Sequence, residues 1–545
     1  MTIFLSTDVS NHAADVSFTV LTAVIGLAVL LLTIWLLTKY IKRPKYAETF
    51  AKKLATFEAL PAEKQGERPQ KFSFVGIWFA IMLFGVLIRI LFAFLTAGYR
   101  PDYYLIVGDL LLNASPAAQF SSNALPHYPL VSYIYMFFGL FARQLGMTAE
   151  SAAMPFMVKL PLIVADIALM VVVYRAGKKH LNEYCALIFT GFVALFPPFM
   201  MLSSVWGSTY ALLLPLLVAT FYFMANKKMV LVFATFTAAL LTSRSALYLF
   251  PVVAVFVVYQ TVKAFLFMRR NKVEGGFKGK LKNPETKNAF LLPAYAVGFW
   301  LLSWLITLPL IASHSANPFI FTHMIYFYPL GFTHTNSYFG FNALNVFNLF
   351  VGVSGNGAPW TATPGMSALF SVLFGLIITA LVILVYVTRK NRALLVFLAG
   401  YVYLTLSIFF IDFGAVNLIV VITLFVLAFM LVRDKRILLI AGVLGLILTL
   451  NISFVFMNAG FLNTLPASYF DPMHGVANID WIALGGTTGN EGWLAANLVL
   501  SVLTIITFIY ATVVILDIAM SNKRKLFSDL DNPSFLTSLK KFIKA

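Results

Sequence analysis

Long apolar runs recur along the chain and are separated by short loops rich in lysine and arginine. A helix needs about 20 consecutive apolar residues to cross a bilayer, and runs near this length occur thirteen times. Charged residues make up 11% of the 545 residues, against about 25% in a typical soluble domain. The sequence therefore predicts an all-α, polytopic transmembrane helix bundle. The expected spans cover residues 17–38, 74–97, 156–174, 183–203, 208–224, 228–243, 245–262, 289–312, 366–388, 393–410, 414–432, 437–457 and 494–517.

The basic residues between these spans predict the orientation of the bundle. They cluster in the loops 39–71 and 263–287 and in the tail from Lys523. Shorter clusters occur at 175–179, 227–228, 389–392 and 433–436. By the positive-inside rule all of them are cytoplasmic, which places the N-terminus outside and the C-terminus inside the plasma membrane. The net charge of +18 is then expected to face anionic membrane lipids and not nucleic acid.

One apolar segment, residues 129–142, is too short for a span. Counting it as a span would move every later basic cluster outside, so we expect a helix that lies on the outer face. The first apolar run is followed rather than preceded by lysines, which predicts a retained helix and not a cleaved signal peptide. The expected organisation is an N-terminal helix with a basic cytoplasmic loop (1–73), a transmembrane core (74–460), and a last region with an outer loop, a final span and a basic tail (461–545).

Three long segments, 98–155, 313–365 and 458–493, are expected outside and hold most of the histidines. Loops of this length commonly carry function. One group in the last segment offers ligands for a divalent cation. Its spacing fits no metal-binding loop, so a solvated loop is the better explanation. No other cofactor is indicated, and a single cysteine, Cys185, excludes an internal disulfide. The group consists of Asp471, His474, Asp480 and Glu491.

Charged residues at or inside the spans are the first functional candidates, because a charge near the bilayer core is costly without a partner or a task. Asp102 lies five residues after the span 74–97 and is the leading candidate for a general base. Arg89 and Asp166 lie inside spans and are expected to form a buried pair. Arg244 interrupts apolar sequence at an outer helix junction, where it would either contact a bound anion or extend to the surface.

Five motifs occur in a defined order on the expected outer side. They are Gly98-Tyr99-Arg100-Pro101-Asp102, His127-Tyr128-Pro129-Leu130, Lys159-Leu-Pro-Leu-Ile-Val-Ala-Asp166, Trp206-Gly207-Ser208-Thr209-Tyr210 and Asn342-Ala343-Leu344-Asn345. This order resembles the GT-C superfamily of polytopic membrane glycosyltransferases, both the bacterial mannosyltransferase-like proteins and the dolichyl-phosphate-glucose-dependent glucosyltransferases. The resemblance covers about residues 74–460.

The resemblance implies a GT-C bundle and an inverting sugar transfer at the extracytoplasmic face. The donor would be a polyprenyl-phosphate sugar, and the acceptor a cell-envelope glycan, lipid or protein. Asp102 would take the acceptor's proton, since the lipid phosphate is already a competent leaving group. The leaving phosphate would also need cations on the outer face, for which Arg100, Lys159 and Arg244 are the candidates. The other candidates for substrate binding are His127, Tyr128, Trp206, Asn342 and Asn345.

Departures from the family pattern keep two alternatives open. The Gln and Asp of the family's Trp-Gly-Gln-x-Asp motif are Ser208 and Tyr210 here, and its Met-His-Glu-Arg-Tyr motif is absent near residues 411–415. The chain could therefore be a catalytically inactive protein of the same fold that partners another membrane protein or binds a lipid-linked glycan. A lipid-linked sugar flippase is the second alternative, although the spans carry few charges beyond Arg89 and Asp166.

Overall fold

A computed structural model of the chain describes most of its helices. The described residues are 12–59, 72–95, 112, 128–205, 207–270, 279–280, 283, 286–311, 337–338, 344, 346, 349, 361–362, 373, 376–386, 392–409, 415–457 and 491–520.

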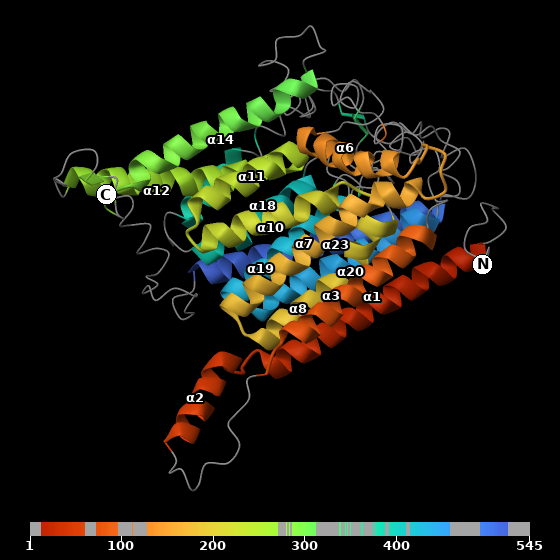
Figure 1. Ribbon diagram of the computed structural model, residues 1–545, viewed down its shortest axis with the longest axis horizontal. Helices are drawn as coiled ribbons and strands as arrows, with labels where there is room; N and C mark the ends of the chain where they lie inside the picture. Colours follow the sequence, from red (N-terminus) through yellow and green to blue (C-terminus); the bar gives the residue numbers. More distant parts are fainter. Residues whose placement is uncertain are drawn as a thin grey trace.

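The described part is an all-α bundle (Figure 1). Its first helices are α1 (His12–Tyr40), α2 (Tyr46–Glu58), α3 (Val75–Leu95), α6 (Pro129–Gln144), α7 (Met154–His180), α8 (Glu183–Leu195), α9 (Pro197–Met200) and the π-helix η4 (Met201–Val205). Next come α10 (Tyr210–Ala225), α11 (Met229–Thr242), the 3-10 helix η5 (Arg244–Leu249), α12 (Phe250–Arg270) and α14 (Asn288–Ile311). The last are α18 (Arg392–Phe409), the 3-10 helix η6 (Ala415–Asn417), α19 (Leu418–Val432), α20 (Lys435–Met457) and α23 (Glu491–Met520). A two-residue antiparallel ladder pairs β1 (Ser337–Tyr338) with β2 (Thr361–Ala362).

The helices confirm a multi-pass membrane protein, but not the expected number of spans. Among the described residues, eight helices are long and apolar enough to cross a bilayer, and a bent pair, α8 with α9 and η4, makes up to nine. The other apolar helices, such as α10, α11 and α18, have 10–17 residues in their apolar part. Each of the thirteen predicted ranges overlaps an apolar helix. The count of thirteen crossings therefore stays a prediction.

Helix α19 forms the centre of the bundle, because every one of its fifteen residues is buried. It packs between α18 and α20 and also touches α7 and α10. A helix that is apolar on all sides is suited to this position. Helices α1, α3 and α14 lie at the periphery and leave rows of leucine, phenylalanine and tryptophan exposed. Those outer surfaces are the ones that lipid would cover.

Most of the described basic clusters gather at one end of the bundle, which we call the basic end. Asn182 donates to the carbonyl oxygens of Tyr40 and Arg43, each at 3.0 Å. Lys45 donates to the Lys179 carbonyl at 3.1 Å. These contacts join the end of α1 to the α7–α8 turn, and Figure 1 shows α2 extending away from the bundle at this end.

The helices α19, α20 and α23 reach the same end through Arg433 and Arg436. Arg433 donates to the His180 carbonyl at 2.6 Å. Arg436 pairs with Asp434 at 2.9 Å and with Asp517 at 2.7 Å. Clusters that are far apart in sequence are thus close in space, as the positive-inside interpretation requires.

Two segments add detail to the expectations. The 39–71 region contains the amphipathic helix α2, whose apolar positions Tyr46, Phe50, Leu54 and Phe57 share one face.

Helix α6 covers the short apolar segment with 16 residues, fewer than a span needs. It packs against α7, α11 and α14 at the end opposite α2 (Figure 1). Helices α1 and α23 both pack on α20. The domain limits at 73 and 461 stay predictions.

Candidate functional site: two buried polar clusters away from the basic end

The bent span formed by α8, α9 and η4 is broken by Pro197 and Pro198. Phe196 precedes them in an extended conformation, with φ −73° and ψ 122°, because a following proline disfavours helical geometry. The axis bends by 54° at this point. Neither proline has a backbone N–H, so the carbonyls of Val193 and Ala194, four residues earlier, lose their helical donors. Two buried carbonyls therefore need other partners.

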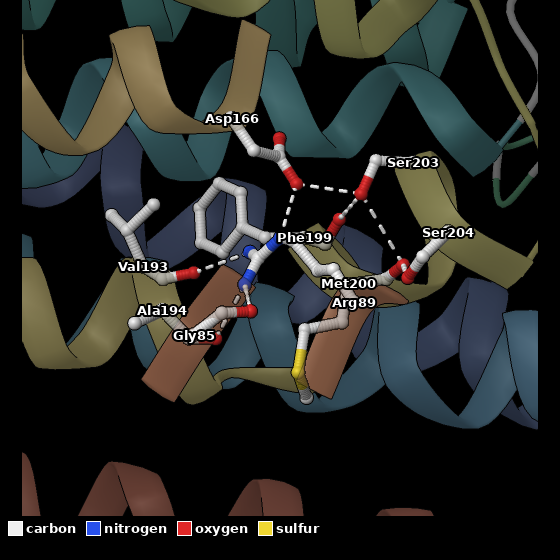
Figure 2. A network of polar contacts seen from close by, with 9 residues as sticks. All are labelled: Gly85, Arg89, Asp166, Val193, Ala194, Phe199, Met200, Ser203 and Ser204. Carbon is white, nitrogen blue, oxygen red and sulfur yellow. Dashed lines mark hydrogen bonds and ion pairs between the residues drawn. The ribbon is translucent and has the colours of Figure 1, made fainter. Parts of the chain in front are cut away.

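Arg89 of α3 supplies those donors (Figure 2). Its guanidinium donates to the Ala194 carbonyl through Nη1 at 2.7 Å and to the Val193 carbonyl through Nη2 at 3.0 Å. Nη1 also reaches the Gly85 carbonyl at 3.1 Å. The planar guanidinium has five N–H groups in a fixed geometry, so one arginine can complete both carbonyls at once. Arg89 therefore acts as a cap for the end of α8.

Asp166 of α7 balances the charge of Arg89, as the sequence predicted. Arg89 Nε donates to Asp166 Oδ2 at 2.6 Å, and both side chains are at most 1% exposed. Ser203 of η4 donates to the same oxygen at 2.6 Å. Within the described part of the chain Asp166 Oδ1 has no hydrogen-bond partner. The three residues link α3, α7 and the π-helical turn, and Figure 2 shows them meeting in one cluster.

Gly207 lies two residues after Val205, the last residue of the π-helix η4. This glycine has φ +72°, a left-handed conformation that other residues rarely adopt. The N–H of Ser208 bonds back to the Leu202 carbonyl at 2.8 Å, one residue further back than in an ordinary glycine-capped α-helix. Extra-residue π turns occur often at functional sites. Helix α10 begins three residues after Gly207, at Tyr210.

Tyr210 belongs to a second buried cluster, which we call the tyrosine–asparagine network. The Tyr210 hydroxyl donates to Asn417 Oδ1 at 2.7 Å, and the Tyr403 hydroxyl donates to the same oxygen at 3.2 Å. The hydroxyl groups of Tyr210 and Ser245 are 2.8 Å apart. All four side chains are buried. The network joins α10, η5, α18 and η6, which are separated widely in sequence.

Three residues predicted to bind substrate are described, and all three are buried. Lys159 is 0% exposed and its Nζ donates to the Ala93 carbonyl at 3.4 Å. Arg244 is 5% exposed and precedes Ser245 of the network. Its burial is contrary to the alternative that it extends to the surface. Tyr128 is buried at the start of α6. The structure therefore places two cations and a tyrosine away from the basic end.

The remaining predicted site residues lie outside the described residues. They are Asp102, Arg100, His127, Trp206, Asn342 and Asn345. Of the group considered for a divalent cation, Glu491 begins α23 and the others are likewise outside the described part. Among the described residues no three His, Cys, Asp or Glu side chains come together in a way that could hold a metal. Cys185 is buried as a free thiol.

The described side chains define what this half of the bundle can do chemically. Arg244 and Lys159 are cations suited to an anion such as phosphate, and tyrosine and serine hydroxyls can bind polar groups. Among the described residues, the buried carboxylate in this half is that of Asp166, which is already engaged by Arg89 and Ser203. A proton acceptor for catalysis would therefore come from outside these two clusters.

Sequence reasoning missed the role of Tyr210, Ser245, Tyr403 and Asn417. None of the four carries a charge, and although Tyr210 ends the motif at residues 206–210, the motif gave no indication of its three partners. Pro197-Pro198 gave a usable signal, since two adjacent prolines in an apolar run predict two carbonyls without donors. That signal would have identified the partners of Arg89.

The fold and the buried clusters define the chain as a multi-pass, all-α membrane protein with polar groups buried among its helices. Comparison with protein-family models and with curated proteins gives no match.

Proposed function

We propose that the protein is a GT-C-type membrane glycosyltransferase. It would transfer a sugar from a polyprenyl-phosphate donor to a cell-envelope acceptor, a glycan, lipid or protein, at the extracytoplasmic side of the plasma membrane. The thirteen predicted crossings, with the N-terminus outside and the C-terminus inside, belong to this proposal. The observation that carries it is the burial of Lys159 and Arg244 in the half of the bundle away from the basic end.

Electrostatics support a phosphate ligand in that half. Lys159 lies in α7 seven residues before Asp166, and Ala93, which accepts from it, lies four residues after Arg89 in α3. At 1.5 Å per residue, Lys159 is about 10 Å further along α7 than the Arg89–Asp166 pair. The pair stabilises the bent span, while Lys159 lies nearer the outer end. Cations in a site with little water stabilise the charge that develops on a leaving phosphate.

In this mechanism Asp102 takes the proton of the acceptor hydroxyl as that oxygen attacks the anomeric carbon, and the polyprenyl phosphate leaves. Arg244, Arg100 and Lys159 would stabilise the leaving phosphate. Trp206, Asn342 and Asn345 would line the sugar cavity, with His127 and Tyr128 at its edge. One general base is sufficient, because the leaving phosphate does not have to be protonated by a general acid.

One observation favours the catalytically inactive alternative. Tyr210 stands where the family motif has aspartate, and its hydroxyl is committed to Asn417 and Ser245. At that position the chain has a structural crosslink in place of an acid. A partner subunit or a binder of lipid-linked glycan would retain this crosslink without needing Asp102.

The decisive experiment compares Asp102→Asn with Asp109→Asn in the native host after deletion of the chromosomal gene. Asp109 is the matched control, since it is an acid in the same outer segment. For a transferase, Asp102→Asn abolishes the surface glycan that depends on the gene, while Asp109→Asn restores it, both at normal protein level. The amount of protein in the membrane is measured in parallel by immunoblot.

An unchanged glycan with Asp102→Asn would exclude Asp102 as the base. If deletion of the gene still removed the glycan, the partner role would then explain the result. Arg244→Gln and Arg244→Lys separate charge from shape in the same assay. A phosphate contact predicts that Arg244→Lys keeps more activity than Arg244→Gln, because lysine retains the positive charge. The difference should lie mainly in the concentration of donor lipid that each variant needs for activity.

A further inference from the structure

An apolar groove opens between α1 and α20 at the basic end. Ile34 and Leu37 of α1 line it together with Ile41, the residue after α1, and Leu438 and Leu439 line it from α20. The groove has a volume of about 240 Å³. Leu439 is 50% exposed, so the groove is open to the surroundings of the bundle and not sealed inside it.

Away from the groove, α1 and α20 are in close contact. There, Thr22 and Ser453 are joined by a hydrogen bond of 2.7 Å. Further along, a Cβ atom on Gly442 would come within 2.7 Å of Leu30 Cδ1, so glycine permits the close approach. The groove lies beyond this contact, toward the basic end, where isoleucine and leucine side chains of α1 and α20 line it.

Two cations stand at the mouth of the groove. Lys435 lines it, is exposed, and makes no hydrogen bond or ion pair within the described part of the chain. Arg436 is held in place by Asp434 and Asp517 through Nε and Nη2. Its Nη1 makes no hydrogen bond among the described residues. A guanidinium held by two carboxylates beside an exposed ammonium offers donors for a phosphate at the edge of the apolar groove.

We propose that this groove binds an anionic diacyl phospholipid, with one acyl chain between α1 and α20 and the headgroup phosphate on Lys435 and Arg436. The charges favour this occupant over a neutral lipid, because Lys435 has no carboxylate partner within the described part of the chain. Basic pockets between helices at the membrane surface are suited to such headgroups. The site is separate from the proposed transfer site and does not depend on it.

Native mass spectrometry of the full-length protein tests the proposal. The protein is released from detergent after incubation with equal amounts of phosphatidylglycerol and phosphatidylcholine, and the bound lipids are counted. We expect wild type to retain phosphatidylglycerol in preference. Lys435→Gln should reduce that preference about fivefold, the effect of one basic residue on an anionic headgroup. Leu439→Trp should fill the groove and remove binding of both lipids.

Two matched variants control the test. Lys228→Gln removes another exposed lysine at the basic end, and Leu301→Trp adds the same ring to an exposed position on α14. Both should bind lipid as wild type does. The proposal is wrong if wild type binds the two lipids equally, if Lys435→Gln and Lys228→Gln behave alike, or if the groove is covered by a second copy in a lipid-independent dimer. A thermal shift on adding phosphatidylglycerol, smaller in Lys435→Gln, gives a second readout.

Discussion

The Nη1 atom of Arg89 in α3 lies 2.7 Å from the carbonyl oxygen of Ala194, at the point where α8 ends. That carbonyl would accept from residue 198 in a continuous helix, but residue 198 is proline. Arg89 therefore replaces a hydrogen bond that the chain itself has removed. The need for Asp166 follows, since a guanidinium at this depth requires a counter-charge.

Removing the guanidinium should destabilise the protein strongly. Arg89→Met leaves the buried Asp166 carboxylate without its counter-charge and two carbonyls without donors, and loss of one member of a buried pair costs about 3–5 kcal/mol. Arg175→Met is the control, because Arg175 is exposed on the same helix as Asp166. Thermal unfolding in detergent, followed by size-exclusion chromatography, measures the difference. A melting temperature for Arg89→Met equal to that of the control would contradict the capping role.

Restoring backbone donors should make Arg89 less important. In a Pro197→Ala, Pro198→Ala background, residues 197 and 198 regain N–H groups that can serve the carbonyls of Val193 and Ala194. We expect the cost of Arg89→Met to be smaller in this background by about 1–3 kcal/mol, a coupling typical of groups in one network. A double-mutant cycle of unfolding free energies measures it. Strict additivity would show that the prolines and Arg89 act independently.

The positions of the helices and the Arg89–Asp166 pair could be predicted from the sequence, for physical reasons. Backbone groups in a bilayer must be satisfied within helices, so apolar length alone predicts where helices lie. Arg89 and Asp166 could be paired because an isolated charge inside a span is costly. Crossings are harder to count, since short apolar helices such as α10 and α11 fit either a span or a shorter element. Hydropathy does not distinguish these cases.

The tyrosine–asparagine network could not be predicted, because Tyr210 and Asn417 are 207 positions apart. Neutral polar side chains leave no periodicity and little change in hydropathy. Their meeting depends on how α10, α18 and η6 pack, which is a property of the whole fold. Lys159 and Arg244 were identified by charge, and their burial came only from the structure. Asp102, the residue on which catalysis depends in the proposal, lies outside the described residues.

Tyr210→Phe should weaken the bundle moderately. It removes the 2.7 Å bond to Asn417 Oδ1 but leaves the weaker bond from Tyr403, so the expected loss is about 1–2 kcal/mol. Tyr403→Phe should cost less, since its bond is longer. Tyr510→Phe is the control, because Tyr510 is exposed on α23. Unfolding in urea-containing detergent compares the three, and an effect of Tyr210→Phe no larger than that of Tyr510→Phe would argue against a structural crosslink.

Adding a methyl group at Gly442 should destabilise the protein, whereas adding one at Gly298 should not. At Gly442 the new Cβ would meet Leu30 at 2.7 Å, and overpacking of this kind costs about 1–3 kcal/mol. Gly298 in α14 has open space around it, so alanine there should be neutral or stabilising by up to about 1 kcal/mol. Melting temperatures of the two alanine variants decide the point. Equal shifts would mean that α1 adjusts freely against α20.

Cysteine labelling can test the orientation proposed for the bundle. Cys185, the single native thiol, is buried, and Cys185→Ala gives a background without thiols. Glu150 and Lys228 are both exposed, Glu150 just before α7 and Lys228 just before α11. With the basic end in the cytoplasm, a membrane-impermeant maleimide should label Glu150→Cys in intact cells. It should label Lys228→Cys only after the membrane is opened. The reverse pattern would place the basic end outside, against the electrostatic preference for lysine and arginine on the cytoplasmic side. It would also move Lys159 and Arg244 to the cytoplasmic half, where a transfer to the cell surface could not occur.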